Sequence, residues 1–252
     1  GVKGMKWGVR RSQEELDRLG GRAYTFEKVG NDYVLKKGSK VHRVTATPNK
    51  EKKGYAYVSF DDLDVKGYRK EITRWLEEDG VGKTFDMTMK ATHDLLLPGE
   101  LTKVKTFINL FEDKKISDID LIRIKKSYGN GSELVGKPKR LCDVMVSQGM
   151  DHNLAERYAL FNVALYEYPT IRELFFNSLK EKGYSAVEDF EDMYSHRVRP
   201  VIVFDREKSL KVTNVLPLPS SLEEGWDKII NDARASDKLT KEILKARGVT
   251  YA

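Results

Sequence analysis

The chain of 252 residues lacks most of the features on which familiar catalytic and binding motifs depend. Its single cysteine, Cys142, cannot form an internal disulfide, which fits a reducing compartment. The four histidines, His42, His93, His152 and His196, are scattered, and with one cysteine they offer no zinc-ligand spacing. Neither Gly-x-Gly-x-x-Gly nor Gly-x-x-x-x-Gly-Lys-Ser/Thr occurs, so the sequence holds no ordinary phosphate-cradling loop.

The chain also lacks long hydrophobic runs and a strong excess of one charge. No apolar run approaches the roughly 20 residues that span a bilayer, and the start has no apolar signal-peptide region, so we expect a soluble, non-secreted protein without membrane contact. Apolar residues make up 40% and charged residues 33%, which is typical of a globular protein. The net charge of +6 arises from 45 basic and 39 acidic residues, and this mild excess permits nucleic acid as a partner without requiring it.

Lysine clusters are the main feature that would favour nucleic acid. They lie at residues 36–37, 50–53, 125–126 and 137–140. The clusters are separated and lack the interleaved arginines and aromatics of a single-strand platform. Solvated surface faces explain them better, and nucleic-acid binding stays a third alternative.

The first 21 residues stand apart from the rest of the chain. Residues 1–11 are basic, contain one large aromatic, Trp7, and show neither helical nor strand periodicity. Ser12 and Glu15 then form a capping-box pattern, which predicts a short helix that ends at Gly20-Gly21. We therefore expect the opening peptide to be an appended tag and not part of a core.

The string GVKGMKWGVRR resembles a peptide, G-x-K-G-M-K-W-G-x-R, that recurs in otherwise different structural and head-associated proteins of tailed bacteriophages. The match covers residues 1–11 only, and its Met-Lys-Trp-Gly core is its specific part. The resemblance implies a phage-encoded protein located in the virion or the host cytoplasm. Its expected partner is the phage head or a host protein.

The first half of the remaining chain is predicted to be rich in β structure. Aromatic and β-branched runs predict strands at residues 33–35, 41–45, 55–60 and 84–89. Between the last two, an acidic start predicts a helix that ends at Gly80. Its apolar stripe is expected to face a core. The stripe consists of Tyr68, Ile72, Trp75 and Leu76.

The second half is predicted to be mostly helical and to return to strands near its end. One expected helix carries Ile116, Ile119 and Ile122 on its buried face, and another begins near Pro169 and is capped by Gly183. Short strands are expected at 184–188, 200–205 and 210–212. The resulting division is 1–21 (tag and short helix), 22–95 (β-rich first half of a core), 96–182 (helical insertion), 183–219 (closing β-hairpin) and 220–252 (helical tail).

A spaced set of polar residues accompanies the predicted strands. His42 and Arg43 lie on an early strand, Tyr57 and Ser59 on the next, and Glu188-Asp189 beside a late one. The segments KVHRVT, YVSFDDLDVKGY and KGYSAVEDFED with RPVIVFD resemble, in order, motifs of the ADP-ribosyltransferase fold, over about residues 22–212. The resemblance implies an α+β fold: an ADP-ribosyltransferase-like split β-sheet core with a large helical insertion.

That resemblance assigns roles to the polar residues and NAD as the cofactor. His42, Arg43, Tyr57 and Ser59 would bind NAD, with Arg43 pairing with the pyrophosphate and Tyr57 stacking on nicotinamide. Cleavage of the nicotinamide bond develops positive charge on the ribose, which a carboxylate stabilises. Glu188 is the first candidate for that acid and Asp189 the second; on a continuing strand they point to opposite faces.

Each of these residues also has a purely structural explanation. Arg43 reads as a surface strand residue, Tyr57 as a core aromatic, Ser59 as a strand-end hydroxyl, and Glu188-Asp189 as a solvated turn. A non-catalytic virion or host-interaction protein that uses the same fold as a scaffold is therefore the main alternative to a transferase. The enzyme hypothesis requires that Arg43, Tyr57 and one of the acids surround one cleft.

Overall fold

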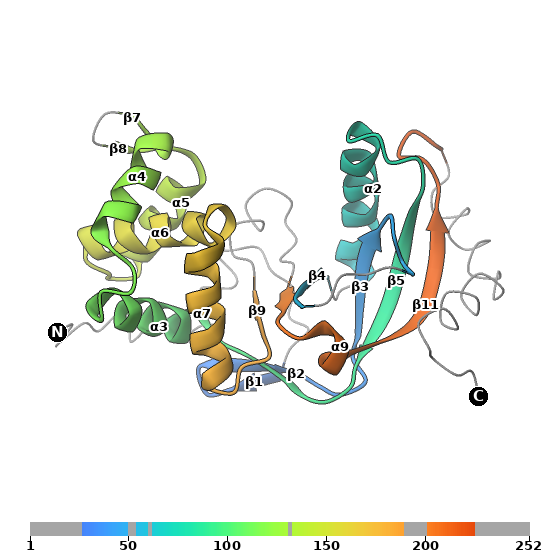
Figure 1. Ribbon diagram of the computed structural model, residues 1–252, viewed down its shortest axis with the longest axis horizontal. Helices are drawn as coiled ribbons and strands as arrows, with labels where there is room; N and C mark the ends of the chain where they lie inside the picture. Colours follow the sequence, from blue (N-terminus) through green and yellow to red (C-terminus); the bar gives the residue numbers. More distant parts are fainter. Residues whose placement is uncertain (1–26, 50–53, 60–61, 131–132, 189–200, 225–252) are drawn as a thin grey trace. The chain divides into compact units, whose positions relative to one another are not determined.

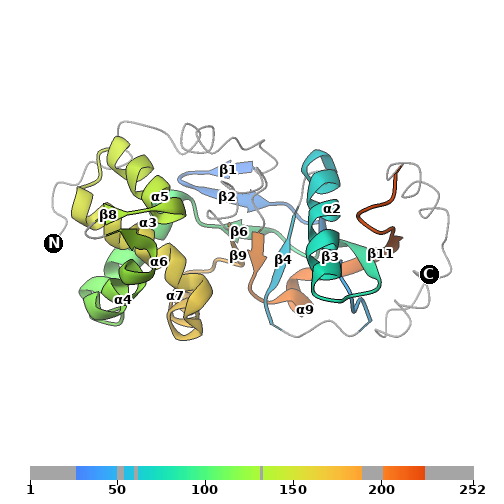
Figure 2. The ribbon, with the colours of Figure 1, turned by 90° about the horizontal axis from the view of Figure 1, so that it is seen from above.

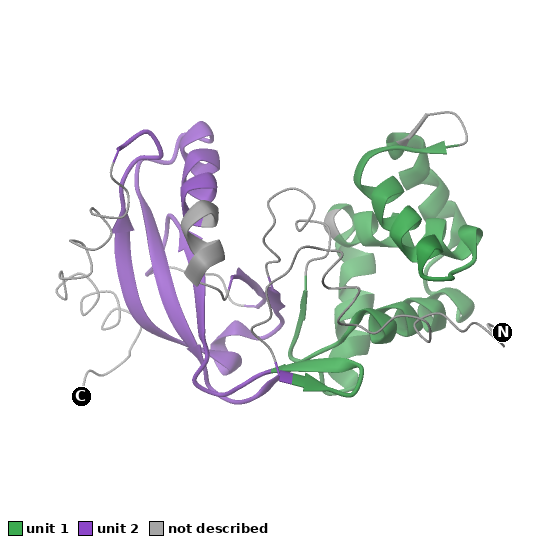
Figure 3. Cartoon of the chain, turned by 180° about the vertical axis from the view of Figure 1, so that it is seen from behind, with its two compact units in different colours: residues 1–24, 28–34, 96–199 green, residues 25–27, 35–95, 200–252 purple. Residues whose placement is uncertain are grey.

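The computed structural model describes residues 27–49, 54–59, 62–130, 133–188 and 201–224, which form two compact units (Figures 1 and 3). Among these residues, the first unit comprises 28–34 and 96–188, and the second comprises 27, 35–95 and 201–224. The described residues hold seven helices and small antiparallel sheets, so the expected α+β class is confirmed. The N-terminal tag with its short helix, the tail helix and Asp189 lie outside the described residues.

The first unit is mainly helical. Its strands are β1 (Glu27–Val29), β2 (Asp32–Leu35), β6 (Leu95–Leu97), β7 (Gly129–Asn130), β8 (Glu133–Leu134) and β9 (Ala186–Glu188), except that the end residues Glu27, Leu35 and Leu95 belong to the second unit. Its helices are α3 (Glu100–Glu112), α4 (Asp118–Tyr128), α5 (Gly136–Ser147), α6 (His152–Glu167) and α7 (Pro169–Glu181). Five helices therefore fall within residues 96–182, the stretch expected to be helical, which opens with part of the short strand β6.

An aromatic cluster forms the core of this unit. The ring of Phe107 on α3 stacks on Phe161 of α6 at 4.8 Å between centroids, and Phe161 meets Phe175 of α7 edge-on at 5.0 Å. All three residues are at most 1% exposed. Such pairs add to the free energy that burial of their area already provides, so they fix α3, α6 and α7 against one another.

Helix α4 departs from its predicted burial pattern. Ile116 is buried, but Ile119 and Ile122 are 63% and 52% exposed, so the expectation that they share its face was wrong. The buried residues of the helix are Leu121 and Ile124, three positions apart. The reason is that Ile116 precedes the helix, which begins at Asp118, so helical spacing cannot be counted from it.

The end of α7 follows the sequence signal closely. Gly183 has φ +91°, and its N–H donates to the carbonyl of Lys180 at 2.9 Å. The N–H of Tyr184 donates to the carbonyl of Leu179 at 3.1 Å. This pair of bonds is a Schellman motif, which requires a left-handed residue and so favours glycine there. The predicted glycine cap is confirmed.

The second unit is built around a three-stranded antiparallel sheet in the order β11-β5-β3. Its elements are β3 (Lys40–Thr45), β4 (Ala56–Val58), α2 (Asp62–Glu78), β5 (Thr84–Ala91), β10 (Val201–Val203), α9 (Arg206–Ser209) and β11 (Leu210–Leu218). Strand β4 pairs antiparallel with β10, with Tyr57 opposite Ile202. The strands predicted from sequence are present, with β4 shorter and β11 longer than expected.

The two faces of this sheet differ in chemistry. The register places His42 opposite Thr88 and Arg43 opposite Met87, so neighbouring residues of β3 belong to different faces. One face is apolar, with Val41, Met87, Met89 and Val215 at most 1% exposed. The other carries His42, Asp86 and Thr88 together with the apolar cluster of Val44, Leu216 and Leu218, and helix α2 lies along it (Figures 1 and 2).

Helix α2 packs on this face partly through polar side chains. Ile72, Trp75 and Leu76 are only half-buried, whereas Arg69 and Thr73 are 3% and 1% exposed. Thr73 hydrogen-bonds Thr84 of β5 at 3.3 Å, and Arg69 pairs with Asp86 of the same strand. The helix therefore buries Arg69 and Thr73 against polar groups of the sheet, whereas Ile72, Trp75 and Leu76 of the predicted stripe are partly buried. Tyr68, the fourth member of that stripe, has no described side chain.

Candidate functional site

Strands β3 and β4 bring together the four residues that the sequence nominated for the cofactor. The main chains of His42 and Ser59 exchange two hydrogen bonds, of 2.6 and 2.9 Å between nitrogen and oxygen. One residue further along β3, Arg43 donates from Nη1 to the carbonyl oxygen of Tyr57 at 3.2 Å. The two motifs thus lie side by side in the second unit.

Strand geometry divides these side chains between two faces. His42 and Ser59 form a hydrogen-bonded antiparallel pair, so their side chains share a face, and they are 5% and 1% exposed. Arg43 follows His42 and points to the opposite face. Arg43 and Tyr57 are both half-buried. The structural interpretations of Arg43 as a surface strand residue and of Tyr57 as a core aromatic both stay open.

On the sheet face that α2 covers, His42 belongs to a buried cluster with Arg69, Asp86 and Thr88. Arg69 Nη2 lies 2.8 Å from Asp86 Oδ2, and both side chains are at most 4% exposed. Nδ1 of His42 lies 3.4 Å from Arg69 Nη2 and 3.3 Å from Thr88 Oγ1. Nδ1 of His42 also lies 3.6 Å from Asp86 Oδ2. We call these four residues the polar seam.

The hydrogen bonding of the seam is incomplete within the part of the chain that the structure describes. Asp86 Oδ2 faces Arg69 as an ion pair without hydrogen-bond alignment, and Asp86 Oδ1, Arg69 Nε and Ser59 Oγ have no hydrogen-bond partner. Buried polar atoms of this kind are costly, so natural folds keep few of them. The ion pair is the main compensation for burial of the two charges.

Glu188 is placed differently from the other candidates. It ends β9 in the first unit, is 8% exposed, and is therefore not part of a solvated turn. His42, Arg43, Tyr57 and Ser59 belong to the second unit. Asp189 lies outside the described residues. The gathering of Arg43, Tyr57 and an acid around one cleft stays a prediction.

Sequence reasoning missed Arg69, Asp86 and Thr88. A signal for two of them was present, because Thr84, Asp86 and Thr88 alternate with Phe85, Met87 and Met89. Such alternation normally indicates a strand with one solvated face. Here helix α2 covers that face, and the prediction for this helix rested on its apolar residues and did not consider Arg69.

The lysine clusters are partly neutralised within the units. Lys36 lies 3.4 Å from Glu27 and 3.5 Å from Asp94, and the hydrogen bond with Glu27, followed by the charge of Asp94, raises the pKa of Lys36. Lys125 and Lys139 also form ion pairs, at 2.5 and 2.8 Å. These lysines share their charge with carboxylates, which reduces the positive potential of the clusters.

Comparisons with known proteins gave no match to a family model, a curated protein or a solved structure. In the described ranges, no group of three or more histidine, cysteine, aspartate or glutamate side chains is arranged to hold a metal ion. A search of the same residues found no helix with the length and apolarity needed to cross a membrane.

Proposed function

We propose that this chain is a phage-encoded protein with an ADP-ribosyltransferase-like domain, which transfers ADP-ribose from NAD to a host protein. The observation that carries the proposal is the contact between the two nominated motifs: Arg43 reaches the Tyr57 carbonyl beside the His42–Ser59 bridge. Arg43 and Tyr57 are 14 positions apart in sequence, and this contact joins them where β3 and β4 lie side by side. We call this the β3–β4 edge.

The chemistry of this edge fits part of a dinucleotide. Arg43 has a planar guanidinium with five N–H donors, and its contact with the Tyr57 carbonyl uses Nη1. Held in this way, it is suited to bind a pyrophosphate in a bidentate manner. The half-buried ring of Tyr57 is the aromatic surface proposed for nicotinamide. By strand alternation it lies on the face of Ser59, so it would contact NAD from the face opposite to the Arg43 side chain, which reaches only the main-chain carbonyl of Tyr57.

His42 and Ser59 fit a positioning role better than direct contact with NAD. The His42 ring lies within the polar seam, and the Ser59 side chain is 1% exposed. Their paired main chains hold β3 and β4 in register, which in turn sets Arg43 against Tyr57. We therefore revise their proposed roles from cofactor binding to support of the binding edge.

NAD, when bound, supplies the glycosidic bond whose cleavage makes ADP-ribose available for transfer. Glu188 is the residue proposed to stabilise the positive charge that develops on the ribose. Its carboxyl is buried in the first unit, and a buried carboxylate acts on nearby charge more strongly than an exposed one does. Asp189 is the second candidate for this role.

Release of nicotinamide tests the proposal. The full chain, incubated with NAD and a host lysate, is expected to release nicotinamide and to label a host protein with ADP-ribose. Glu188→Gln should abolish both, whereas Arg74→Ala, which removes an exposed arginine from α2, should change neither. Intact NAD with the folded wild-type chain would overturn the transferase proposal.

The buried seam also favours a second candidate, a non-catalytic virion or host-interaction protein. His42 and Ser59, two of the four nominated residues, are buried and support the fold. This is expected of a scaffold that retains the strands but has no catalytic activity. Under this candidate the chain is recovered from purified virions or on a host protein, and NAD has no effect on that association.

A further inference from the structure

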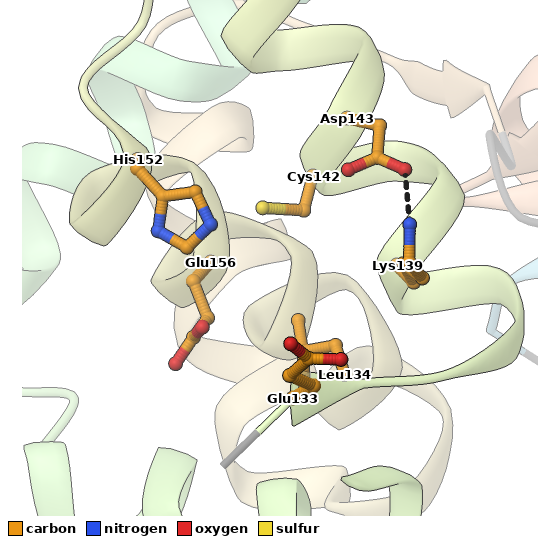
Figure 4. A pocket seen from close by; sticks show the side chains of 7 residues that line it. All are labelled: Glu133, Leu134, Lys139, Cys142, Asp143, His152 and Glu156. Carbon is orange, nitrogen blue, oxygen red and sulfur yellow. Dashed lines mark hydrogen bonds and ion pairs between the residues drawn. The ribbon is translucent and has the colours of Figure 1, made fainter. Parts of the chain in front are cut away.

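A pocket of about 430 Å³ lies in the first unit, lined by residues of β8, α5 and α6 (Figure 4). It is separate in sequence from the β3–β4 edge and has no role in the proposed transfer. Its volume is within the range of about 300–1,000 Å³ that small-ligand sites occupy. The following inference does not depend on NAD binding.

Helix geometry gathers the lining residues. On α5, Lys139, Cys142 and Asp143 are spaced i, i+3 and i+4, so they share one face. On α6, His152 and Glu156 are spaced i and i+4 and also share a face. Figure 4 shows the Cys142 sulfur and the His152 ring turned toward one another across the pocket.

A tight turn between α5 and α6 brings their pocket-lining faces close to each other. Helix α5 ends in a Schellman motif: Gly149 has φ +96°, and Met150 N–H donates to the Met145 carbonyl at 3.1 Å. Asp151 then caps α6 by accepting the Leu154 N–H at 3.2 Å. The Asp151 carboxylate offsets the positive end of the α6 dipole, so the helix start does not make the pocket attractive to anions.

The charge of the lining is predominantly negative. Glu133, Asp143 and Glu156 contribute three carboxylates, against the single ammonium of Lys139. Lys139 pairs with Asp143 at 2.8 Å, and Lys125 donates to Oε1 of Glu156 at 2.5 Å. Among the described residues, no hydrogen bond or ion pair involves the Glu133 carboxylate, although its charge helps to raise the pKa of Lys139; the charge of Glu156 likewise helps to raise the pKa of Arg157.

The wall of the pocket adds an apolar surface and a buried thiol. Leu134 and Cys142 are 6% and 4% exposed, and no hydrogen bond joins the thiol to another described residue. Burial, followed by the charges of Asp143 and Glu156, raises the pKa of Cys142 to about 11. The thiol is therefore neutral at pH 7 and offers polarisable packing surface instead of a nucleophile.

We propose that this pocket binds a ligand with an alkyl stem and an ammonium or guanidinium head. The head would lie between the carboxylates of Glu133 and Glu156, and the stem would pack on Leu134 and Cys142. An anion would meet the Glu133 carboxylate beside two carboxylates that are already ion-paired, and the lining does not form a metal site. The same chemistry is offered by a free alkyl amine and by the arginine or lysine side chain of a protein.

Two probes distinguish these sources in titrations of the full chain by calorimetry. Agmatine represents the free amine, and acetyl-Gly-Arg-Gly-amide represents the side chain; the citrulline peptide is the uncharged control. Binding of agmatine or of the arginine peptide supports the site, and the tighter probe identifies the source. If neither probe binds, or if the citrulline peptide binds as well as the arginine peptide, the proposal is wrong.

Charge-removing variants locate the site. Glu156→Gln and Glu133→Gln should each weaken the bound probe about tenfold, since each removes one carboxylate from the cation. Glu173→Gln, at an exposed position of α7, is the matched control and should leave affinity unchanged. Equal affinities in all variants would overturn the assignment.

The single cysteine provides a readout that needs no ligand affinity. A trimethylammonium methanethiosulfonate is expected to modify Cys142 about tenfold faster than the anionic sulfonate reagent, because the carboxylates attract one and repel the other. The ratio should fall toward one in Glu133→Gln/Glu156→Gln. Faster modification by the anionic reagent would contradict the proposal.

Discussion

At the scale of single residues, the polar seam is a costly feature of the described structure. Arg69 and Asp86 are both charged and nearly inaccessible, and their ion pair lies beside the His42 ring. Burial of a pair costs several kcal/mol per ion, which the mutual attraction offsets only while both partners are present. Loss of one partner should therefore be much worse than loss of both.

Asp86→Ala is expected to destabilise the second unit by about 3–5 kcal/mol, because it leaves the Arg69 charge buried and uncompensated. Urea unfolding followed by circular dichroism measures this. Glu71→Ala is the matched control, since it removes the partner of the exposed Arg74 on the same helix and should cost about 0–1 kcal/mol. Arg69→Met/Asp86→Leu should recover part of the loss; equal effects of Asp86→Ala and Glu71→Ala would refute this description of the seam.

Cys142 gives a pH-dependent prediction. Its folded pKa of about 11 lies above its ordinary value of 9.0, so its contribution to stability is fully present below pH 9 and is lost as pH rises through 11. At pH 8, iodoacetamide should alkylate the folded chain about 100-fold more slowly than the urea-unfolded chain, through the thiolate fraction alone. Alkylation at similar rates in both states would show that the thiol is not held in the buried environment.

At the scale of elements, helix α3 receives its cap from a distant strand. Gly99 precedes the helix and has no side chain to cap it. Asp32 of β2 instead accepts the Gly99 N–H at 3.0 Å and the Thr102 hydroxyl at 2.7 Å, while its other oxygen accepts the Tyr184 hydroxyl at 2.7 Å. Burial and this bond to Asp32 raise the pKa of Tyr184 to about 12.

Asp32→Ala is expected to lower the free energy of unfolding by about 2–3 kcal/mol, since it removes a cap and two further hydrogen bonds. Tyr184→Phe removes one of these bonds and should cost about 1 kcal/mol. Chemical denaturation of the two variants measures both values. A loss for Asp32→Ala no larger than for Tyr184→Phe would mean that the cap contributes nothing.

Sequence predicted the elements better than it predicted their buried faces. Local signals, such as the glycine that ends α7 and the β-branched run of β3, depend on nearby residues and were read correctly. The faces of α2 and α4 depend on what covers them. Arg69 is buried because it forms an ion pair with Asp86 of β5. Ile122 is exposed, although its helical spacing from Ile119 predicted a buried side chain.

The candidate site shows the same limit. The pairing of β3 with β4 followed from the motif resemblance, but the enclosure of His42 by Arg69, Asp86 and Thr88 did not, since these residues come from two other elements. The pocket of α5 and α6 was also invisible in the sequence, because none of its residues forms a recognised motif. Tertiary packing, and not local pattern, creates both features.

At the scale of the whole molecule, the described chain forms two units with different character. The first is helical with an aromatic core and holds Glu188; the second is built on a sheet and holds Arg43 and Tyr57. The proposed transfer assigns the role of the acid to Glu188 and cofactor binding to Arg43 and Tyr57. The β3–β4 edge is the part of this proposal that can be tested alone, without knowledge of an acceptor.

Calorimetric titration of NAD into the full chain tests the central claim most directly. We predict saturable binding that Arg43→Gln weakens about tenfold or more, because it removes a charge-assisted contact with pyrophosphate. Arg74→Gln, on the exposed side of α2, should bind NAD like the wild type, with melting curves establishing that both variants are folded. No NAD binding by the folded wild-type chain, or equal affinity in Arg43→Gln and Arg74→Gln, would contradict the account.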